Sequence, residues 1–142
     1  MIKGILFDKD GTLIDFYEVW GKAAVKVAKR LCDARRMPER QRMLLREMGV
    51  ADGRVDPDGA LAWKSYRGVA EDLQEYLGTD SEKLAGELAE LFYEEVGLKR
   101  TAYPTFTDIK AMMEALRSRG LWIGVATTDD LKSTRRCLEV LG

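Results

Sequence analysis

The sequence predicts an α/β fold in which two parallel strands are separated along the chain by a long helical insertion. Two continuous apolar runs, at residues 5–7 and 121–126, are typical of short buried strands of a parallel sheet. The residues between them, roughly 16–100, show helical periodicity and no strand signal. These two observations predict a small parallel core into which an all-helical part is inserted.

The insertion begins with the longest predicted helix. Val19, Ala23, Val27 and Leu31 are spaced by four and predict a helix over residues 16–34. Pro38 suits the start of a second helix, over 39–48, which Gly49 ends. A loop is predicted for residues 51–59 because Asp-Gly and Asp-Pro steps lie close together there. Its alternating aspartates lack the closing Glu of a calcium loop, so we interpret them as turn residues.

Three more helices complete the insertion, and the chain then returns to the core. They are predicted over residues 60–64, 68–77 and 81–96, with Gly78 ending the second and Asp80 near the start of the third. Pro104 favours an extended entry into the core. A helix over 107–119, a strand over 121–126 and a helix from about Leu131 follow.

Composition excludes several function classes. A net charge of −1 with 33% charged and 46% hydrophobic residues is typical of a globular domain and gives no basic surface for nucleic acid. The chain has no histidine, which excludes Ser-His-Asp and Cys-His catalysis and histidine-bound zinc. No apolar stretch is long enough to span a membrane, and no signal peptide is visible. Cys32 and Cys137 show no metal spacing, so we expect free thiols and a cytoplasmic location.

Two acidic residues follow the first predicted strand directly. Asp8 and Asp10 follow it, and Gly11 permits a tight turn. Residues i and i+2 of an extended chain point the same way, so we expect both carboxylates to face one site with a cation between them. Oxygen ligands of this kind suit Mg²⁺.

The run Phe7-Asp8-Lys9-Asp10-Gly11-Thr12-Leu13 resembles the first motif of the haloacid dehalogenase (HAD) superfamily of phosphatases. The resemblance implies that Asp8 is the nucleophile and Asp10 the general acid and base. It implies that Mg²⁺ is held by the Asp8 side chain and the Asp10 carbonyl. Thr12 is expected to help hold Asp10, and the Lys9–Gly11 backbone amides to face phosphate oxygens.

A second motif of the family, a Thr or Ser after the second core strand, corresponds to Thr127. Its hydroxyl is expected to bind a phosphoryl oxygen, although Thr128 serves equally and stands where the family often has Asn. The resemblance implies a partial HAD-like Rossmann-type parallel core at residues 1–15 and 102–142. It also implies that residues 16–101 form a helical cap, as in phosphoglycolate phosphatase-type members. Tyr17, Trp20 and Lys22 are candidate cap contacts.

The family's third motif, a Lys, and its fourth, an acidic pair, have no match in residues 1–142. The resemblance predicts a Mg²⁺-dependent phosphatase that hydrolyses a small phosphomonoester through an aspartyl-phosphate, with these 142 residues inactive alone. The alternative is a non-catalytic truncated homologue that binds phosphate or a protein. An apolar two-stranded sheet has open edges, so we expect a C-terminal segment or another copy of the chain to cover it.

Overall fold

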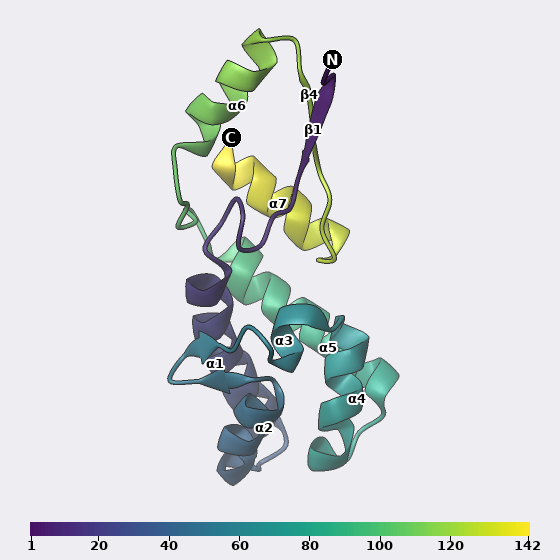
Figure 1. Cartoon of the computed structure of the whole chain (residues 1–142). Coiled ribbons are helices and arrows are strands. Elements are labelled where there is room, and N and C mark those ends of the chain that lie inside the picture. Colours follow the sequence, from purple (N-terminus) through teal and green to yellow (C-terminus); the bar gives the residue numbers. More distant parts are fainter.

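The computed structural model describes all 142 residues of the chain. Its elements, in chain order, are β1 (Gly4–Phe7), α1 (Phe16–Ala34), η1 (Pro38–Arg40), α2 (Gln41–Glu47), β2 (Val50–Ala51), β3 (Arg54–Val55), α3 (Ala60–Trp63), α4 (Tyr66–Leu77), α5 (Ser81–Phe92), η2 (Tyr93–Leu98), α6 (Ile109–Ser118), β4 (Trp122–Val125) and α7 (Leu131–Leu141). Figure 1 shows two parts: β1, β4, α6 and α7 lie at one end of the molecule, and α1 to α5 lie at the other.

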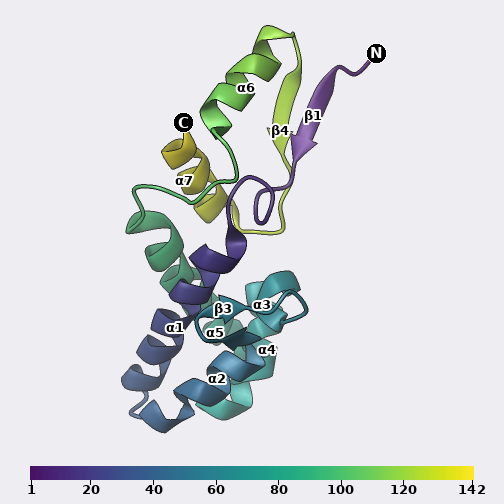
Figure 2. The ribbon, with the colours of Figure 1, turned by 60° about the vertical axis from the view of Figure 1, so that its left-hand side comes forward.

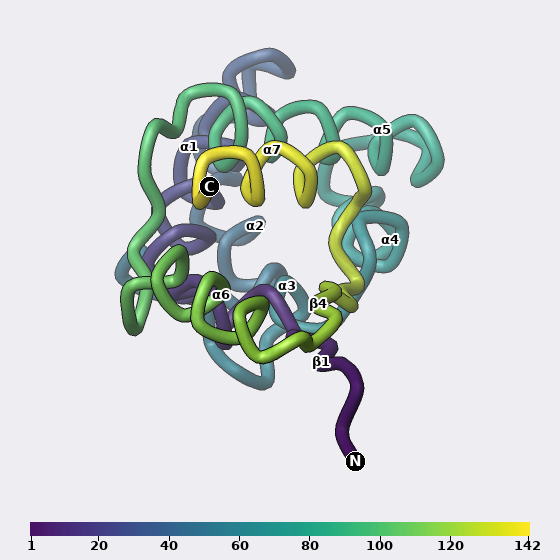
Figure 3. Tube along the Cα trace, turned by 90° about the horizontal axis from the view of Figure 1, so that it is seen from above, coloured from purple at the N-terminus to yellow at the C-terminus, as the bar shows by residue number.

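The predicted parallel pairing of the two core strands is confirmed. β1 pairs with β4, and Phe7 lies opposite Val125. The expectation that both strands are buried is wrong, because Leu6 is 75% exposed and Trp122 is 81% exposed. A two-stranded sheet buries little of its surface unless layers cover both faces, and here α6 is the helix that packs against β4. The N-terminal residues extend away from the rest of the molecule in Figure 3.

The predicted helices form close to their expected bounds, because most begin at side chains that cap them. Carboxylates of aspartates cap α1, α5, α6 and α7, and the hydroxyl of a serine caps α4, in each case by accepting from a main-chain N–H of the first turn. Gly78, with a φ of 60°, ends α4. The predicted helix over 81–96 instead changes at Tyr93 into η2, a π-helical turn.

The helical part also contains a β-hairpin, so the expectation of an all-helical insertion is wrong in this detail. β2 and β3 pair antiparallel at the start of the loop predicted over residues 51–59, and Val50 lies just before it. Asp52 and Gly53 have positive φ angles, 51° and 71°, as a two-residue type I′ turn requires. The hairpin lies so close to α1 that a Cβ on Gly21 would stand 2.0 Å from the Gly53 carbonyl oxygen. Two-residue strands are too short to show alternation in a sequence, and only the Asp-Gly step indicated them.

The main hydrophobic core lies entirely within the helical part. Its 21 buried residues all fall between Val19 and Val96. The rings of Trp20 and Phe92 lie 5.2 Å apart and those of Tyr66 and Phe92 lie 5.6 Å apart, so aromatic contacts join α1, α4 and α5. The helical part therefore has the core that an independently packed unit needs.

Two connectors join the parts, as Figure 2 shows at the start of α1 and before α6. The Asp15 N–H donates to the Pro104 carbonyl at 2.8 Å and so ties the connectors together. Across the same junction, Lys132 of α7 lies 3.3 Å from Glu90 of α5 and stands over the Tyr93 ring. These contacts hold the carboxyl edge of the sheet against the helical part.

Candidate active site

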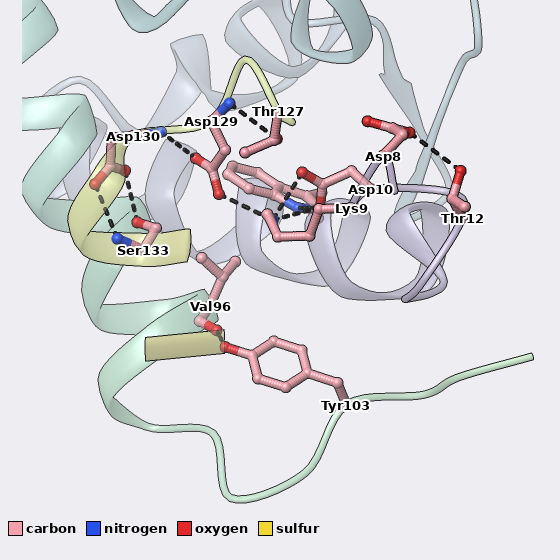
Figure 4. A network of polar contacts seen from close by, with 11 residues as sticks. Asp8, Lys9, Asp10, Thr12, Val96, Tyr103, Thr127, Asp129, Asp130 and Ser133 are labelled. Atoms are coloured by element: carbon pink, nitrogen blue, oxygen red, sulfur yellow. Dashed lines mark hydrogen bonds and ion pairs between the residues drawn. The ribbon is translucent and has the colours of Figure 1, made fainter. Parts of the chain in front are cut away.

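The register of the sheet brings the predicted site residues to one edge. Because Phe7 lies opposite Val125, Asp8 and Thr127 both follow the carboxyl ends of neighbouring parallel strands. This is the edge at which parallel sheets present their ligands. Figure 4 shows Asp8, Lys9, Asp10 and Thr127 together there, with Asp129 beside them.

Asp8 is held by Thr12. The Thr12 hydroxyl donates to Asp8 Oδ2 at 3.2 Å, so the expectation that Thr12 holds Asp10 is wrong. The turn after β1 brings residue 12 back toward residue 8, because Thr12 and Leu13 N–H groups both donate to the Lys9 carbonyl. Asp8 Oδ1 has no hydrogen-bond partner in the chain.

The Asp10 side chain has other hydrogen-bond partners than the Asp8 side chain. Lys9 Nζ donates to Asp10 Oδ1 at 2.8 Å and the Trp20 indole N–H donates to the same oxygen at 3.2 Å. Figure 4 shows the Asp8 carboxylate turned toward Thr12 and the Asp10 carboxylate turned toward Lys9. Strand alternation predicts that the two carboxylates face one site with a cation between them. They do not face one another, because the strand ends at Phe7 and a turn follows.

The Lys9 side chain is the main site feature that sequence reasoning missed. It is 2% exposed, and its ammonium lies 2.7 Å from Asp10 Oδ2 and 3.0 Å from Asp129 Oδ2. Burial alone lowers the pKa of Lys9, but the charges and hydrogen bonds of Asp10 and Asp129 outweigh it and the pKa is raised. Lys9 therefore stays charged and joins the loop after β1 to the loop after β4.

The backbone amides expected to face phosphate are only partly available. The Gly11 N–H donates to the Ile14 carbonyl at 2.9 Å, so Gly11 is not a phosphate donor here. The N–H groups of Lys9 and Asp10 make no hydrogen bond within the chain. These two amides remain candidates for phosphoryl oxygens.

The loop after β4 is arranged by its own side chains. Thr127 Oγ1 accepts from the Asp129 N–H at 3.2 Å, and Asp130 caps α7 by accepting from the N–H and hydroxyl of Ser133. Burial, opposed by the charge on Lys9, raises the pKa of Asp129. Thr128 is exposed and lines the neighbouring cavity, whereas Thr127 does not.

A cavity of about 450 Å³ opens between the two strand-end loops and the helical part. Residues of the loops after β1 and β4 line one side, and residues of the helical part, mainly from α1, α3 and α4, line the other. The lining comprises Asp10, Gly11, Phe16, Tyr17, Trp20, Pro57, Leu61, Ala62, Lys64, Ser65, Tyr66, Arg67, Thr128, Asp129 and Asp130. Of the candidate cap contacts, Tyr17 and Trp20 line it, and Lys22 instead pairs with Glu18 on the surface.

Tyr66 lines this cavity, and its hydroxyl has no partner. Its hydroxyl oxygen is buried and makes no hydrogen bond within the chain. Burial, and then the charges of Asp129, Asp130 and Asp10, raise the pKa of Tyr66 far above its ordinary value. The hydroxyl therefore keeps its proton and is a hydrogen-bond donor.

The donor set at the strand end fits Mg²⁺ in kind. Asp8 offers a carboxylate with a free oxygen, and the Asp10 carbonyl accepts no hydrogen bond. The Asp10 side chain is taken by Lys9 and Trp20, which leaves its carbonyl as the available ligand. The chain contains no group of three or more Asp, Glu, His or Cys side chains placed to hold a metal ion.

Comparison with known proteins identifies the family. A family model described as haloacid dehalogenase-like hydrolase matches residues 2–142. Neither the curated proteins nor the solved structures contain a match to the chain. None of its helices combines the length and apolar character needed to cross a bilayer. Because the family model covers nearly the whole chain, and the loops after β1 and β4 bear the expected residues, this chain belongs to the haloacid dehalogenase-like hydrolases.

Proposed function

We propose that the protein is a Mg²⁺-dependent phosphatase that hydrolyses a small phosphomonoester through an aspartyl-phosphate on Asp8. The observation that carries the proposal is the arrangement after β1. Asp8 is oriented by Thr12 with one oxygen free, and Asp10 lies two residues on at the wall of the cavity. A carboxylate nucleophile beside a second carboxylate is what a two-step displacement needs.

In the first step, Asp8 Oδ1 attacks phosphorus and the ester P–O bond breaks. Asp10, once its carboxyl is released from the Lys9 ammonium and the Trp20 indole that hold it in this structure and is protonated, gives its proton to the leaving oxygen. In the second step, Asp10 takes a proton from water, which attacks phosphorus and releases inorganic phosphate and the Asp8 carboxylate. Bound at the Asp8 carboxylate and Asp10 carbonyl, Mg²⁺ would neutralise charge on the phosphoryl group.

Several neighbouring groups bind the phosphoryl oxygens in this proposal. They are the hydroxyls of Thr127 and Thr128 and the amides of Lys9 and Asp10, which lie at the same edge of the sheet. Thr12 acts on Asp8 by fixing the orientation of its carboxylate. Preorganised donors of this kind stabilise the charge that develops in the transition state.

In this proposal the two parts of the molecule have different functions. Residues 1–15 and 102–142 form the catalytic core in this proposal, and residues 16–101 form a cap of the phosphoglycolate phosphatase type. The position of the main core, which lies wholly within residues 19–96, supports this division. The cap would close over the phosphoryl group, exclude water and select the substrate.

The proposal also covers the substrate, the cellular location and the partners of the protein. The substrate is a small phosphorylated metabolite, with no part for nucleic acid or a membrane. Cys32 and Cys137 are buried free thiols, which suits the reducing cytoplasm. The exposed Leu6 and Trp122 favour association of the sheet with further residues or another copy of the chain.

One observation favours a second candidate. The chain has no cluster of three metal-ligating side chains, so residues 1–142 alone would hold Mg²⁺ weakly. A non-catalytic homologue that binds phosphate or a partner protein would not need tightly bound Mg²⁺. The 142-residue chain assayed by itself is accordingly expected to turn over little or no substrate.

The test is hydrolysis of an aryl phosphate by the complete protein that contains this sequence. We expect activity to disappear with EDTA and to return with Mg²⁺. Asp8→Asn should abolish turnover, whereas Asp52→Asn, in the exposed hairpin turn, should leave it unchanged. Near-normal turnover by Asp8→Asn, with deamidation excluded by mass spectrometry, would contradict the assignment of the nucleophile. Absence of turnover in the wild type, together with phosphate binding, would support the second candidate.

A further inference from the structure

The hydroxyl of Tyr66 makes no hydrogen bond in the fold. Its ring packs between α1 and α5, with centroids 6.4 Å from Trp20 and 5.6 Å from Phe92, but its oxygen is buried without a partner. A buried hydroxyl that lacks a hydrogen bond destabilises a protein relative to phenylalanine at the same position. Tyr103 offers the contrast, because its hydroxyl donates to the Val96 carbonyl.

The cavity that Tyr66 lines lies on one side of the predicted reaction centre. Asp10 and Thr128 contribute to its wall, but neither Asp8 nor Thr127 does. A phosphoryl group on Asp8 would therefore lie at the mouth of the cavity, beside Asp10 and Thr128, with the ester oxygen that Asp10 protonates toward the interior. The cavity is thus placed to receive the leaving group of the ester and not the phosphoryl group itself.

The wall opposite Asp10 shows what such a leaving group would meet. Phe16 and Tyr17 present aromatic surface from α1. The Lys64 ammonium is already paired with Asp72 at 2.6 Å, while the nearest ion partner of the Arg67 guanidinium is Glu71 at 3.6 Å. On this wall Tyr66 is therefore the buried hydrogen-bond donor, and Arg67 is the cation whose ion partner is more distant.

We infer that the Tyr66 hydroxyl donates a hydrogen bond to an oxygen atom of the leaving group, so that the preferred substrates are phosphomonoesters whose organic part carries a carboxylate or hydroxyl oxygen. The inference rests on the proposed phosphatase function and adds a substrate class to it. A ligand oxygen would satisfy the hydroxyl that the protein leaves unpaired. A purely hydrocarbon leaving group would fill the cavity and leave the hydroxyl unpaired, which binding sites discriminate against strongly.

The binding test compares three aryl esters that differ only at the far end of the ring: phenyl phosphate, 4-hydroxyphenyl phosphate and 4-carboxyphenyl phosphate. Calorimetric titrations with Mg²⁺ use the complete protein in an Asp8→Asn background, so that the esters are not hydrolysed. We expect Tyr66→Phe to weaken binding of at least one oxygen-bearing ester about tenfold, equivalent to about 1.4 kcal/mol. Binding of phenyl phosphate and of inorganic phosphate should change less than about twofold.

A second measurement does not depend on any ligand. Tyr66→Phe should unfold at the same urea concentration as the wild type or at a higher one, because it removes an unpaired hydroxyl. The matched control is Tyr103→Phe, which should unfold at a lower concentration because it removes a hydroxyl that is hydrogen-bonded. A fall in midpoint for Tyr66→Phe as large as that of the control would overturn the inference, since the hydroxyl would then have a structural partner.

The outcomes separate the inference from the function on which it rests. An equal effect of Tyr66→Phe on all three esters, no effect on any, or no binding of any ester overturns the inference. Asp8-dependent hydrolysis with unchanged selectivity in Tyr66→Phe leaves the phosphatase proposal standing without the inference. Selective binding that depends on Tyr66, without hydrolysis by the wild type, supports the pocket and rejects the phosphatase.

Discussion

Replacing Lys9 by methionine tests whether the ion network joins the two loops of the site. The ammonium is almost fully buried between Asp10 and Asp129, whose side chains are 19% and 6% exposed. Methionine keeps most of the apolar stem and removes the charge, so little packing is lost. Removing one partner of a buried ion pair costs about 3–5 kcal/mol, because the remaining charges are left without compensation. The partial exposure of Asp10 places the expected loss near the lower end, at about 3 kcal/mol.

The assay is urea unfolding of the wild type and variant at pH 7, followed by circular dichroism. Lys29→Met is the matched control, since Lys29 makes an exposed pair with Asp33 at 2.5 Å within α1. It should lose less than about 0.5 kcal/mol. The double variant Lys9→Met/Asp129→Asn should recover at least about 1 kcal/mol relative to additivity, because it also removes one of the stranded carboxylates. A loss in Lys9→Met no larger than in Lys29→Met would refute the reasoning, as would strict additivity in the double variant.

Two further predictions concern the fold of the helical part. Gly21→Ala should lower the free energy of unfolding by about 2 kcal/mol or more, because a Cβ there meets the hairpin backbone, whereas Gly86→Ala has open space and should raise it by about 0.5–1 kcal/mol; thermal unfolding of both variants decides, and equal effects would count against the close approach. Burial raises the pKa of Glu95, but hydrogen bonds and charges of Lys99 and Lys26 outweigh it and the pKa is lowered. Ionised Glu95 therefore stabilises the fold above its ordinary pKa, and this contribution is lost as the pH falls through the lowered value. Urea titrations should show Glu95→Gln about 1–2 kcal/mol less stable than the wild type at pH 7 and nearer to it at pH 3; a deficit independent of pH would show that the carboxylate charge is not responsible.

The sequence by itself determined most of the elements and the sheet edge at which the candidate site residues lie. Helix periodicity, capping aspartates and the two apolar runs are local signals, and they predict α1, α4 and the parallel partners β1 and β4 near their true bounds. The same signals placed Asp8 and Thr127 at strand ends, and parallel pairing then brings them to one edge whatever the rest of the chain does.

Only the tertiary structure decided which side chains meet there. Lys9 has one partner next to it in sequence and another in the loop after β4, and nothing in a lone lysine between two aspartates indicates the second. The indole of Trp20 reaches Asp10 only because α1 begins beside the turn that follows β1. The position of Tyr66 at the cavity depends on how α4 packs against α1 and α5. Such contacts depend on long-range packing and the burial of charge, and local periodicity does not encode either.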